Sequence, residues 1–145
     1  MTDRIFLDTN VLVYVYEGHD PLKQQRAKAL VRNCIQDESG VLSVQVLGEF
    51  FTVVTRKLSP PLSVEAALEI LRAFDVLPVQ EIDRQIVRRA IDTHRQYAIS
   101  YWDALIVAAA ERAGCRRILT EDLNDGQRYH GIAVEDPFRS VAPPA

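Results

Sequence analysis

The chain has 145 residues, of which 48% are hydrophobic and 26% charged, and its net charge at pH 7 is −3. This length fits one domain with a substantial buried core, and the composition is ordinary for a soluble globular protein. The negative net charge excludes the global basic field that drives nonspecific binding to nucleic acids. Any polyanion would therefore have to be held by a bound cation or by a local basic patch.

The sequence also bears on cellular location. The first residues, 1–4, lead directly into an apolar segment, which leaves no room for a signal peptide. No apolar run approaches the roughly 20 residues that span a membrane. Cys34 and Cys115 lie far apart and outside any metal-ligand spacing, which is typical of reduced thiols. We therefore expect a cytoplasmic protein without a membrane segment.

Short apolar segments alternate with helical patterns along the chain. The predicted strands are 5–7, 41–43, 74–79, 117–120 and 132–134, and the Pro-interrupted segment 74–79 is expected at a sheet edge. The predicted helices are 11–16, 21–37, 44–57, 63–73, a segment that begins at 83, and 101–113.

This alternation predicts an α/β fold with a central, mainly parallel sheet of about four or five strands, flanked by helices in three layers. We expect a single domain over residues 1–138 and a flexible Pro/Ala-rich tail over 139–145.

Asp8 directly follows the first predicted strand, at the end of a strand where open α/β sheets place ligand groups. Asn10 is expected to cap the next helix, because its side-chain oxygen can accept an unpaired backbone N–H. An ordinary alternative is that Asp8 or Thr9 merely helps to cap this helix. The choice depends on whether other carboxylates reach the same place.

Three further acids belong to segments that reach the same edge of the sheet. Asp122 follows the predicted strand 117–120, and Asp103 and Glu49 lie in the first two turns of predicted helices. The carboxyl ends of parallel strands and the N-termini of the following helices share one edge. We therefore expect the four acids to meet in one crevice.

Each of these acids has an ordinary alternative. Asp103 completes a capping box with Ser100, Glu49 is a plausible solvated helix residue, and Asp122 and Asp125 are typical turn residues. Clustered carboxylates, however, repel one another unless a proton or a cation intervenes. Mg²⁺ or Mn²⁺ prefers oxygen ligands and water, and such a site binds phosphate oxygens and lowers the pKa of a bound water. A site of acids without His or Cys argues against zinc.

Four motifs in a fixed order give the chain a family resemblance. They are Phe6-Leu7-Asp8-Thr9-Asn10-Val11-Leu12, Ser43-Val44-Gln45-Val46-Leu47-Gly48-Glu49-Phe50, Ser100-Tyr101-Trp102-Asp103-Ala104-Leu105-Ile106-Val107-Ala108-Ala109-Ala110 and Leu119-Thr120-Glu121-Asp122-Leu123-Asn124-Asp125-Gly126. With this order and spacing, from about residue 4 to 136, the chain resembles PIN-domain ribonucleases. Within them it is most similar to the VapC-type toxins of toxin–antitoxin modules.

The resemblance implies a set of site residues and a reaction. The catalytic and metal-binding quartet would be Asp8, Glu49, Asp103 and Asp122, holding Mg²⁺ or Mn²⁺; Asp125 matches a further acid, and Thr9, Asn10 and Thr120 match supporting polar residues. The implied reaction is metal-assisted hydrolysis of RNA phosphodiester bonds that leaves 3′-hydroxyl and 5′-phosphate ends. A turn with Gly126 after the acid differs from many relatives, which carry an apolar residue there, and leaves the role of Asp125 open.

The resemblance also implies partners: an RNA substrate, a cognate VapB-like antitoxin lying along the toxin groove, and a second copy in a homodimer. Arg112, Arg116 and Arg117 cluster at the end of the apolar helix and are candidate contacts to RNA phosphates. A solvated helix face is the alternative for them.

Other functions stay open at this point. A PIN nuclease of RNA processing that is not a toxin, and a PIN-like RNA- or protein-binding module without catalysis, are both compatible with the fold. Cleavage based on histidine lacks support, because His19, His94 and His130 show no acid–base pairing. A phosphatase that forms an aspartyl-phosphate on Asp8 would usually carry a second Asp at the position of Asn10.

Overall fold

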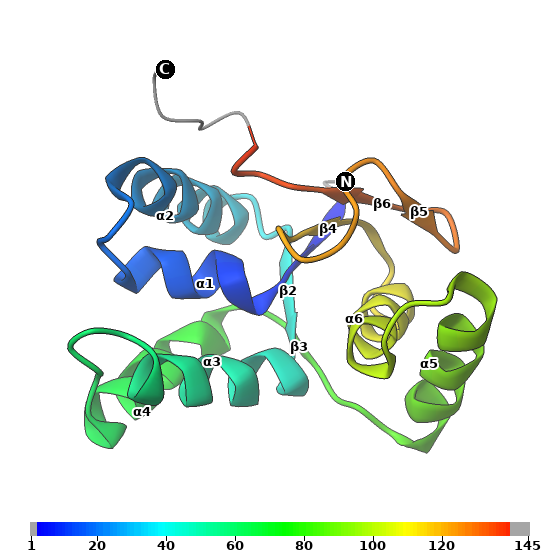
Figure 1. Ribbon diagram of the computed structural model, residues 1–145, viewed down its shortest axis with the longest axis horizontal. Helices are drawn as coiled ribbons and strands as arrows, with labels where there is room; N and C mark the ends of the chain where they lie inside the picture. Colours follow the sequence, from blue (N-terminus) through cyan, green and yellow to red (C-terminus); the bar gives the residue numbers. More distant parts are fainter. Residues whose placement is uncertain (1–2, 140–145) are drawn as a thin grey trace.

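A computed structural model describes residues 3–139, in which helices and strands alternate along the chain (Figure 1). The strands are β1 (Arg4–Leu7), β2 (Gly40–Ser43), β3 (Val79–Gln80), β4 (Cys115–Leu119), β5 (Arg128–Tyr129) and β6 (Ile132–Glu135). The helices are α1 (Thr9–Tyr16), α2 (Pro21–Gln36), α3 (Val44–Arg56), α4 (Val64–Ala73), α5 (Arg84–Tyr97) and α6 (Tyr101–Arg112), with a 3₁₀ turn η1 (Phe74–Val76) after α4. The predicted tail, 139–145, lies outside the described residues except for Arg139.

The six strands form one sheet in the order β3-β2-β1-β4-β6-β5, and every neighbouring pair is parallel except β5 with β6. The predicted α/β fold with a mainly parallel sheet is therefore confirmed. The additional strand, β5, pairs with β6 through a two-residue turn in which His130 has a φ of 52° and Gly131 a φ of 80°. Two consecutive left-handed residues are the geometry of a type I′ hairpin turn.

The predicted strand 74–79 is only partly correct. Residues Phe74–Val76 form η1, and only Val79–Gln80 pair with the sheet, at the edge beside β2. Phe74 explains the difference, because its buried ring packs edge-on against Phe50 with 5.2 Å between centroids. This contact keeps the chain turning against α3 before it reaches the sheet.

The helices cover both faces of the sheet, as expected for three layers. Figure 1 shows α1 to α4 on the left and α5 with α6 on the right, with strands between the two groups. The larger core cluster fills the side of α1 to α4 and the inner face of α6. A smaller cluster joins α5 to α6 through Ile86, Ala90, Ala104, Leu105 and Ala108.

Four predicted helix starts are confirmed by their caps. The side chains of Ser43, Ser63, Asp83 and Ser100 each accept a backbone N–H at the start of α3, α4, α5 and α6. Within residues 3–139, no helix is both long and apolar enough to cross a membrane.

Candidate active site

The site lies beside β1, where the order of the strands in the sheet reverses along the chain. The chain adds β2 and β3 on one side of β1 and then places β4 on the other side. In open α/β sheets, ligands bind outside the carboxyl ends of the strands at this switch point. Leu7 of β1 is paired with Leu119 of β4, so the residues that follow, Asp8 and Thr120, emerge side by side.

Asp8 occupies this corner and is only 5% exposed. Its Oδ1 accepts a hydrogen bond from the backbone N–H of Thr9 at 2.7 Å, and its Oδ2 accepts one from Thr120 Oγ1 at 2.8 Å. The first bond caps α1, so Asp8 is both the cap of this helix and a residue of the site. Burial raises the pKa of Asp8 to about 6; the hydrogen bonds from Thr120 and Thr9 oppose this rise, and the charges of Asp122 and Glu49 add to it.

The predicted role of Asn10 as the cap of α1 is wrong, because the helix begins at Thr9 with Asp8 as its cap. The amide of Asn10 instead bridges two segments. Its Nδ2 donates to Thr120 Oγ1 at 3.1 Å and to Asp122 Oδ2 at 3.2 Å, and its Oδ1 accepts from the N–H of Glu121 at 3.3 Å. Asn10 thus fastens the turn after β4 to the first turn of α1.

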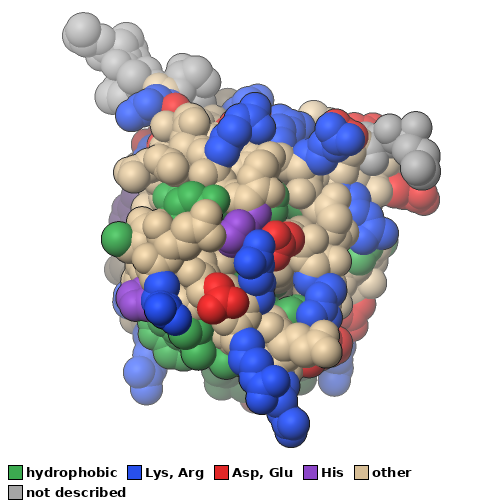
Figure 2. Space-filling model, turned by 90° about the vertical axis from the view of Figure 1, so that its right-hand side faces the viewer, with side chains coloured by type: hydrophobic (Ala, Val, Ile, Leu, Met, Phe, Trp, Pro, Cys, Tyr) green, Lys and Arg blue, Asp and Glu red, His purple; other side chains and the backbone are tan. Residues whose placement is uncertain are grey.

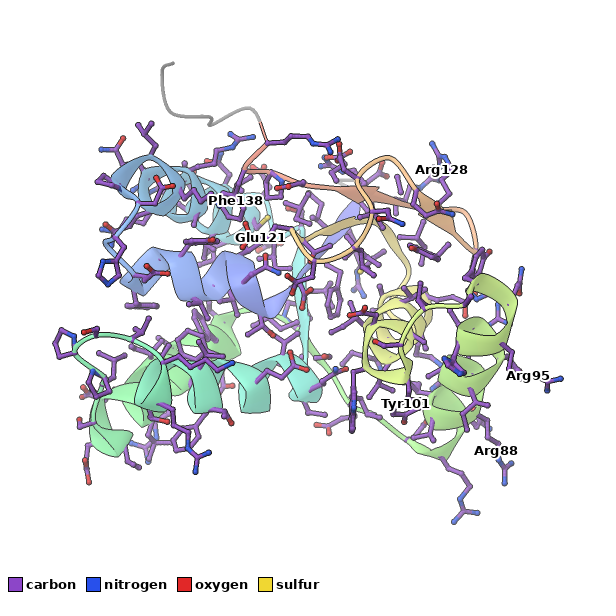
Figure 3. All side chains as sticks on the ribbon, viewed as in Figure 1. Arg88, Arg95, Tyr101, Glu121, Arg128 and Phe138 are labelled. Atoms are coloured by element: carbon purple, nitrogen blue, oxygen red, sulfur yellow. The ribbon has the colours of Figure 1, made fainter. Side chains whose placement is uncertain are left out.

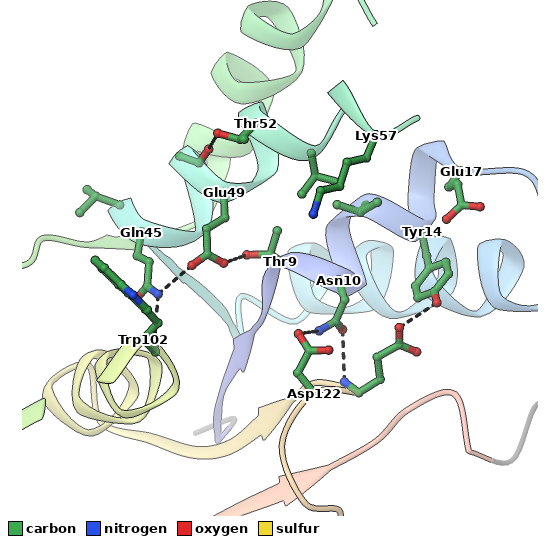
Figure 4. A pocket seen from close by; sticks show the side chains of 15 residues that line it. Thr9, Asn10, Tyr14, Glu17, Gln45, Glu49, Thr52, Lys57, Trp102 and Asp122 are labelled. Carbon is green, nitrogen blue, oxygen red and sulfur yellow. Dashed lines mark hydrogen bonds between the residues drawn. The ribbon is translucent and has the colours of Figure 1, made fainter. Parts of the chain in front are cut away.

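Glu49 points into the same region from α3. Its Oε2 accepts a hydrogen bond from the hydroxyl of Thr9 at 2.8 Å, and its Oε1 accepts one from Gln45 Nε2 at 2.8 Å (Figure 4). Gln45 Nε2 also donates to the backbone carbonyl of Trp102 at 3.2 Å. Gln45 therefore links the acid on α3 to the start of α6.

Asp103 enters from the first turn of α6, where its backbone N–H donates to Ser100 Oγ at 3.1 Å. Burial raises the pKa of its carboxyl, hydrogen bonding with Ser100 lowers it, and the charges of Asp122 and Glu49 raise it further. Asp122 itself is exposed after β4. The structure thus brings together the four acids that the sequence predicted, with Asp122 and Glu49 acting electrostatically on both Asp8 and Asp103.

The donor set suits a hard divalent cation, because it consists of carboxylate oxygens with amide and hydroxyl groups around them. Within residues 3–139, no three His, Cys, Asp or Glu side chains form a ready-made metal cage. Burial is the main cause of the raised pKa of Asp8, and the charges of Asp122 and Glu49 add the repulsion that a bound cation would relieve.

A pocket of about 840 Å³ opens beside the acids, between α1 and α3 (Figure 4). Glu49, Asp122, Thr9, Asn10 and Gln45 line it at the site, and the remaining lining residues are Val13, Tyr14, Glu17, Val44, Gly48, Thr52, Val53, Lys57, Trp102 and Glu121. Asp8 and Asp103 do not line the pocket, but each directly neighbours a lining residue in the chain. A molecule in the pocket would therefore lie against Glu49 and Asp122, the two acids of the quartet that line it.

Asp125 is engaged elsewhere. Its Oδ1 accepts a hydrogen bond from the backbone N–H of Asp136 at 2.8 Å, and its Oδ2 pairs with Arg139 at 2.9 Å. The structure therefore does not bring Asp125 together with the quartet, and its role as a metal ligand stays a prediction.

The three candidate RNA-binding arginines lie away from the acids. Arg112 pairs with Asp83 at 3.0 Å, and Arg117 pairs with Glu135 at 2.9 Å. Arg112 ends α6, about 14 Å along the helix axis from Asp103 in the first turn, at 1.5 Å per residue. Arg116 and Arg117 lie in the first half of β4, whose other end reaches the site. Contacts between these arginines and RNA would lie outside the pocket.

Other arginines lie on the side of the molecule that carries α5. Figure 2 shows Lys and Arg side chains spread over the face that carries α5, with few acids between them. Arg88 and Arg95 on α5 project outward, away from the acidic site (Figure 3).

Sequence reasoning did not assign site roles to several residues that the structure places here. Gln45 lies four residues before Glu49 on α3, and this helical spacing is the signal that could have identified it. Glu121 is contacted by Tyr14 Oη at 2.8 Å and Lys23 Nζ at 3.2 Å. This last cluster gave no sequence signal, because its members come from three distant positions.

Comparisons with known proteins identify the family. The family model described as "PIN domain" matches residues 5–128, so the chain belongs to the PIN-domain family. No match to a curated protein sequence was found.

Several solved structures share the fold over most of the chain. A toxin–antitoxin complex from Klebsiella pneumoniae aligns with a TM-score of 0.69 and 18% identity, covering 92% of this chain and 97% of that chain. DNA-bound VapBC from Salmonella typhimurium aligns with a TM-score of 0.67 and 19% identity, covering 94% and 99%. VapC20 from Mycobacterium tuberculosis, described as a Sarcin-Ricin loop cleaving toxin, aligns with a TM-score of 0.64 and 22% identity, covering 81% and 91%.

Proposed function

We propose that the protein is a Mg²⁺- or Mn²⁺-dependent endoribonuclease and the toxin of a toxin–antitoxin pair. The observation that carries the proposal is the meeting of Asp8, Glu49, Asp103 and Asp122 beside one open pocket, with the pKa of Asp8 raised to about 6. Membership of the PIN-domain family and the likeness to VapC-type structures support it.

Each acid has a distinct part in the proposed centre. Asp8 is the buried, rigidly oriented ligand, because two hydrogen bonds fix its oxygens. Glu49 and Asp103 approach from two helices, and Asp122 is exposed and lines the pocket. A divalent cation bound there would neutralise these charges, hold phosphate oxygens and promote attack by water.

The surrounding residues hold this arrangement. Thr9 positions Glu49, Thr120 positions Asp8, and Asn10 ties Asp122 to α1. Such supporting contacts typically change metal affinity or activity 10- to 100-fold when they are removed. The products expected from attack by water are a 3′-hydroxyl and a 5′-phosphate.

The proposed toxin role implies protein partners. The similar solved structures include toxin–antitoxin complexes, which supports a cognate antitoxin for this chain. A homodimer and a cytoplasmic location belong to the same proposal.

The proposal is tested by incubating the purified protein with ribosomal RNA in Mg²⁺. We expect cleavage that EDTA stops and added Mg²⁺ restores, and that Asp8→Asn and Asp103→Asn abolish. Asp75→Asn is the matched control, because Asp75 is exposed on η1 and does not line the pocket. Cleavage that persists in EDTA, or in both site variants, would contradict the metal-dependent mechanism.

Two further readouts separate the alternatives. A 5′-phosphate on the product supports hydrolysis by water, whereas a cyclic phosphate would indicate a mechanism that uses the RNA 2′-hydroxyl. Growth arrest on expression of the wild type but not of Asp8→Asn supports the toxin role. RNA cleavage without growth arrest would instead favour a nuclease of RNA processing, and Mg²⁺-independent RNA binding without cleavage would favour a binding module.

A further inference from the structure

Trp102 is an exposed aromatic residue at the acidic site. It is the only tryptophan of the chain, it is 63% exposed, and it lines the pocket together with Glu49 and Asp122. Its neighbour in the first turn of α6 is Asp103. An indole with this much exposed surface leaves a large apolar area in water, which is unfavourable unless a ligand covers it.

The surroundings hold Trp102 in place while leaving it accessible. Tyr101 packs edge-on against the indole, with 5.1 Å between ring centroids and 73° between ring planes. The backbone carbonyl of Trp102 accepts a hydrogen bond from Gln45 Nε2, which donates a second one to Glu49. The backbone at Trp102 is therefore tied to α3, and the indole ring itself is held by its contact with Tyr101.

The negative net charge of the protein indicates that its affinity for RNA needs a source other than general electrostatic attraction. With a net charge of −3, the chain lacks the general attraction that basic proteins have for RNA. Lys57 is exposed in the pocket and forms no ion pair within residues 3–139, so one cation is available for a phosphate. Stacking on an aromatic ring is the other main source of affinity for single strands, and it does not depend on charge.

We propose that Trp102 is the platform on which an unpaired base of the RNA substrate stacks, next to the phosphodiester bond that is cut. The proposal rests on the proposed nuclease function and adds a residue that selects the substrate. A base inside a duplex is covered on both faces and cannot stack on Trp102 without leaving the duplex, so the enzyme is expected to cut loops and single strands. Stacking tolerates every base, with a modest preference that follows stacking strength.

The single tryptophan makes the contact directly visible. Intrinsic fluorescence of the protein at tryptophan wavelengths reports Trp102 alone. The measurement uses the Asp8→Asn variant in Mg²⁺, because this substitution is expected to prevent cleavage of the RNA. We expect the RNA octamer rA₈ to quench the fluorescence saturably. A fully paired RNA duplex of the same length, and an octamer of abasic nucleotides, are expected to quench it far less.

Variants at this position then connect the contact to cleavage. In the otherwise wild-type enzyme, we expect Trp102→Ala to raise KM for a single-stranded RNA roughly 5- to 100-fold, with a smaller effect on kcat. Trp102→Phe keeps a ring and is expected to fall between wild type and Trp102→Ala. Val76→Ala is the matched control, because Val76 is also 63% exposed and does not line the pocket. Thermal unfolding of each variant checks that the fold is kept.

The outcomes separate this proposal from the proposed function. If the wild type cleaves RNA and Asp8→Asn does not, but rA₈ leaves the fluorescence unchanged and Trp102→Ala leaves KM unchanged, only the role of Trp102 is overturned. Quenching by octa-arginine but not by rA₈ would assign Trp102 to a protein partner and also overturn it. Failure of the wild type to cleave any RNA would overturn the nuclease function itself.

Discussion

The hydroxyl of Thr120 donates a hydrogen bond to Oδ2 of Asp8 at 2.8 Å, across two neighbouring parallel strands. The hydroxyl oxygen of Thr120 also accepts hydrogen bonds from Asn10 Nδ2 at 3.1 Å and from the N–H of Asp122 at 3.0 Å. Thr120 is fully buried, so no water replaces these contacts. One side chain thus fixes the buried acid and the exposed acid of the quartet relative to each other.

Thr120→Val is therefore expected to disturb both the fold and the site. Loss of the hydroxyl leaves buried polar partners unsatisfied, which costs about 1–3 kcal/mol of unfolding free energy. It also removes a hydrogen bond that lowers the pKa of Asp8, so that the pKa of Asp8 rises above its present value of about 6. Urea unfolding and the pH profile of RNA cleavage measure the two effects.

Thr120→Ser is the matched control for this variant, because it keeps the hydroxyl and loses only a methyl group. We expect its pH profile to stay close to that of the wild type. A Thr120→Val enzyme with unchanged stability and an unchanged pH profile would show that the hydroxyl does not position Asp8.

The raised pKa of Asp8 makes the stability of the metal-free protein depend on pH. The folded-state pKa of about 6 lies above the unfolded value of 3.8, so the folded state binds the extra proton between these values. The stability is therefore greatest below about pH 4 as far as this group is concerned, and about 3 kcal/mol of it is lost as the pH rises through 6. In EDTA, Asp8→Asn is expected to flatten this part of the curve.

Mg²⁺ should reverse this loss, because it binds the ionised carboxylates of the folded protein. We expect Mg²⁺ to raise Tm more at pH 7.5 than at pH 5. Differential scanning calorimetry at the two pH values measures the effect. Equal shifts at both pH values would contradict a cation site that contains Asp8.

Gly40 and Gly48 provide a test of the packing around the start of β2. A Cβ at Gly40 would lie 2.9 Å from Cys34 Cβ and 3.2 Å from Leu77 Cδ2, whereas a Cβ at Gly48 meets nothing within 4 Å. We expect Gly40→Ala to destabilise the protein by about 1–3 kcal/mol through overpacking. Gly48→Ala, in the interior of α3, is expected to stabilise it by about 0.5–1 kcal/mol. Chemical unfolding of both variants measures these changes. An unchanged unfolding free energy in Gly40→Ala would contradict the tight packing around Gly40.

Local sequence patterns predicted much of the fold and the quartet for physical reasons. Strands followed by acids, and helices opened by Ser or Asp caps, are local signals, and the parallel sheet then brings their ends to one edge. Asp8, Glu49, Asp103 and Asp122 can therefore be grouped from the sequence alone. Asn10 was misassigned because a cap and a bridge between segments use the same amide group.

What could not be predicted depends on tertiary contacts. Trp102 and Gln45 meet only because α3 and α6 converge, and Asp125 is held by Arg139 from the end of the described chain. Strand β5 was not predicted, because it has only two residues and its turn, His130-Gly131, lacks the usual Asn-Gly signal. Similarly, Phe74 favours a 3₁₀ turn through its contact with Phe50, which the local pattern of a strand does not show.

The central claim is that four carboxylates from separate segments form one site for a divalent cation. Its most direct measurement is calorimetric titration of the purified protein with Mn²⁺ at pH 7.5, for the wild type, Asp8→Asn, Asp103→Asn and the control Asp75→Asn. We predict saturable binding to the wild type and to Asp75→Asn, and affinity at least about tenfold weaker in both site variants. Equal Mn²⁺ affinity in all four proteins, or no binding to the wild type, would contradict the account.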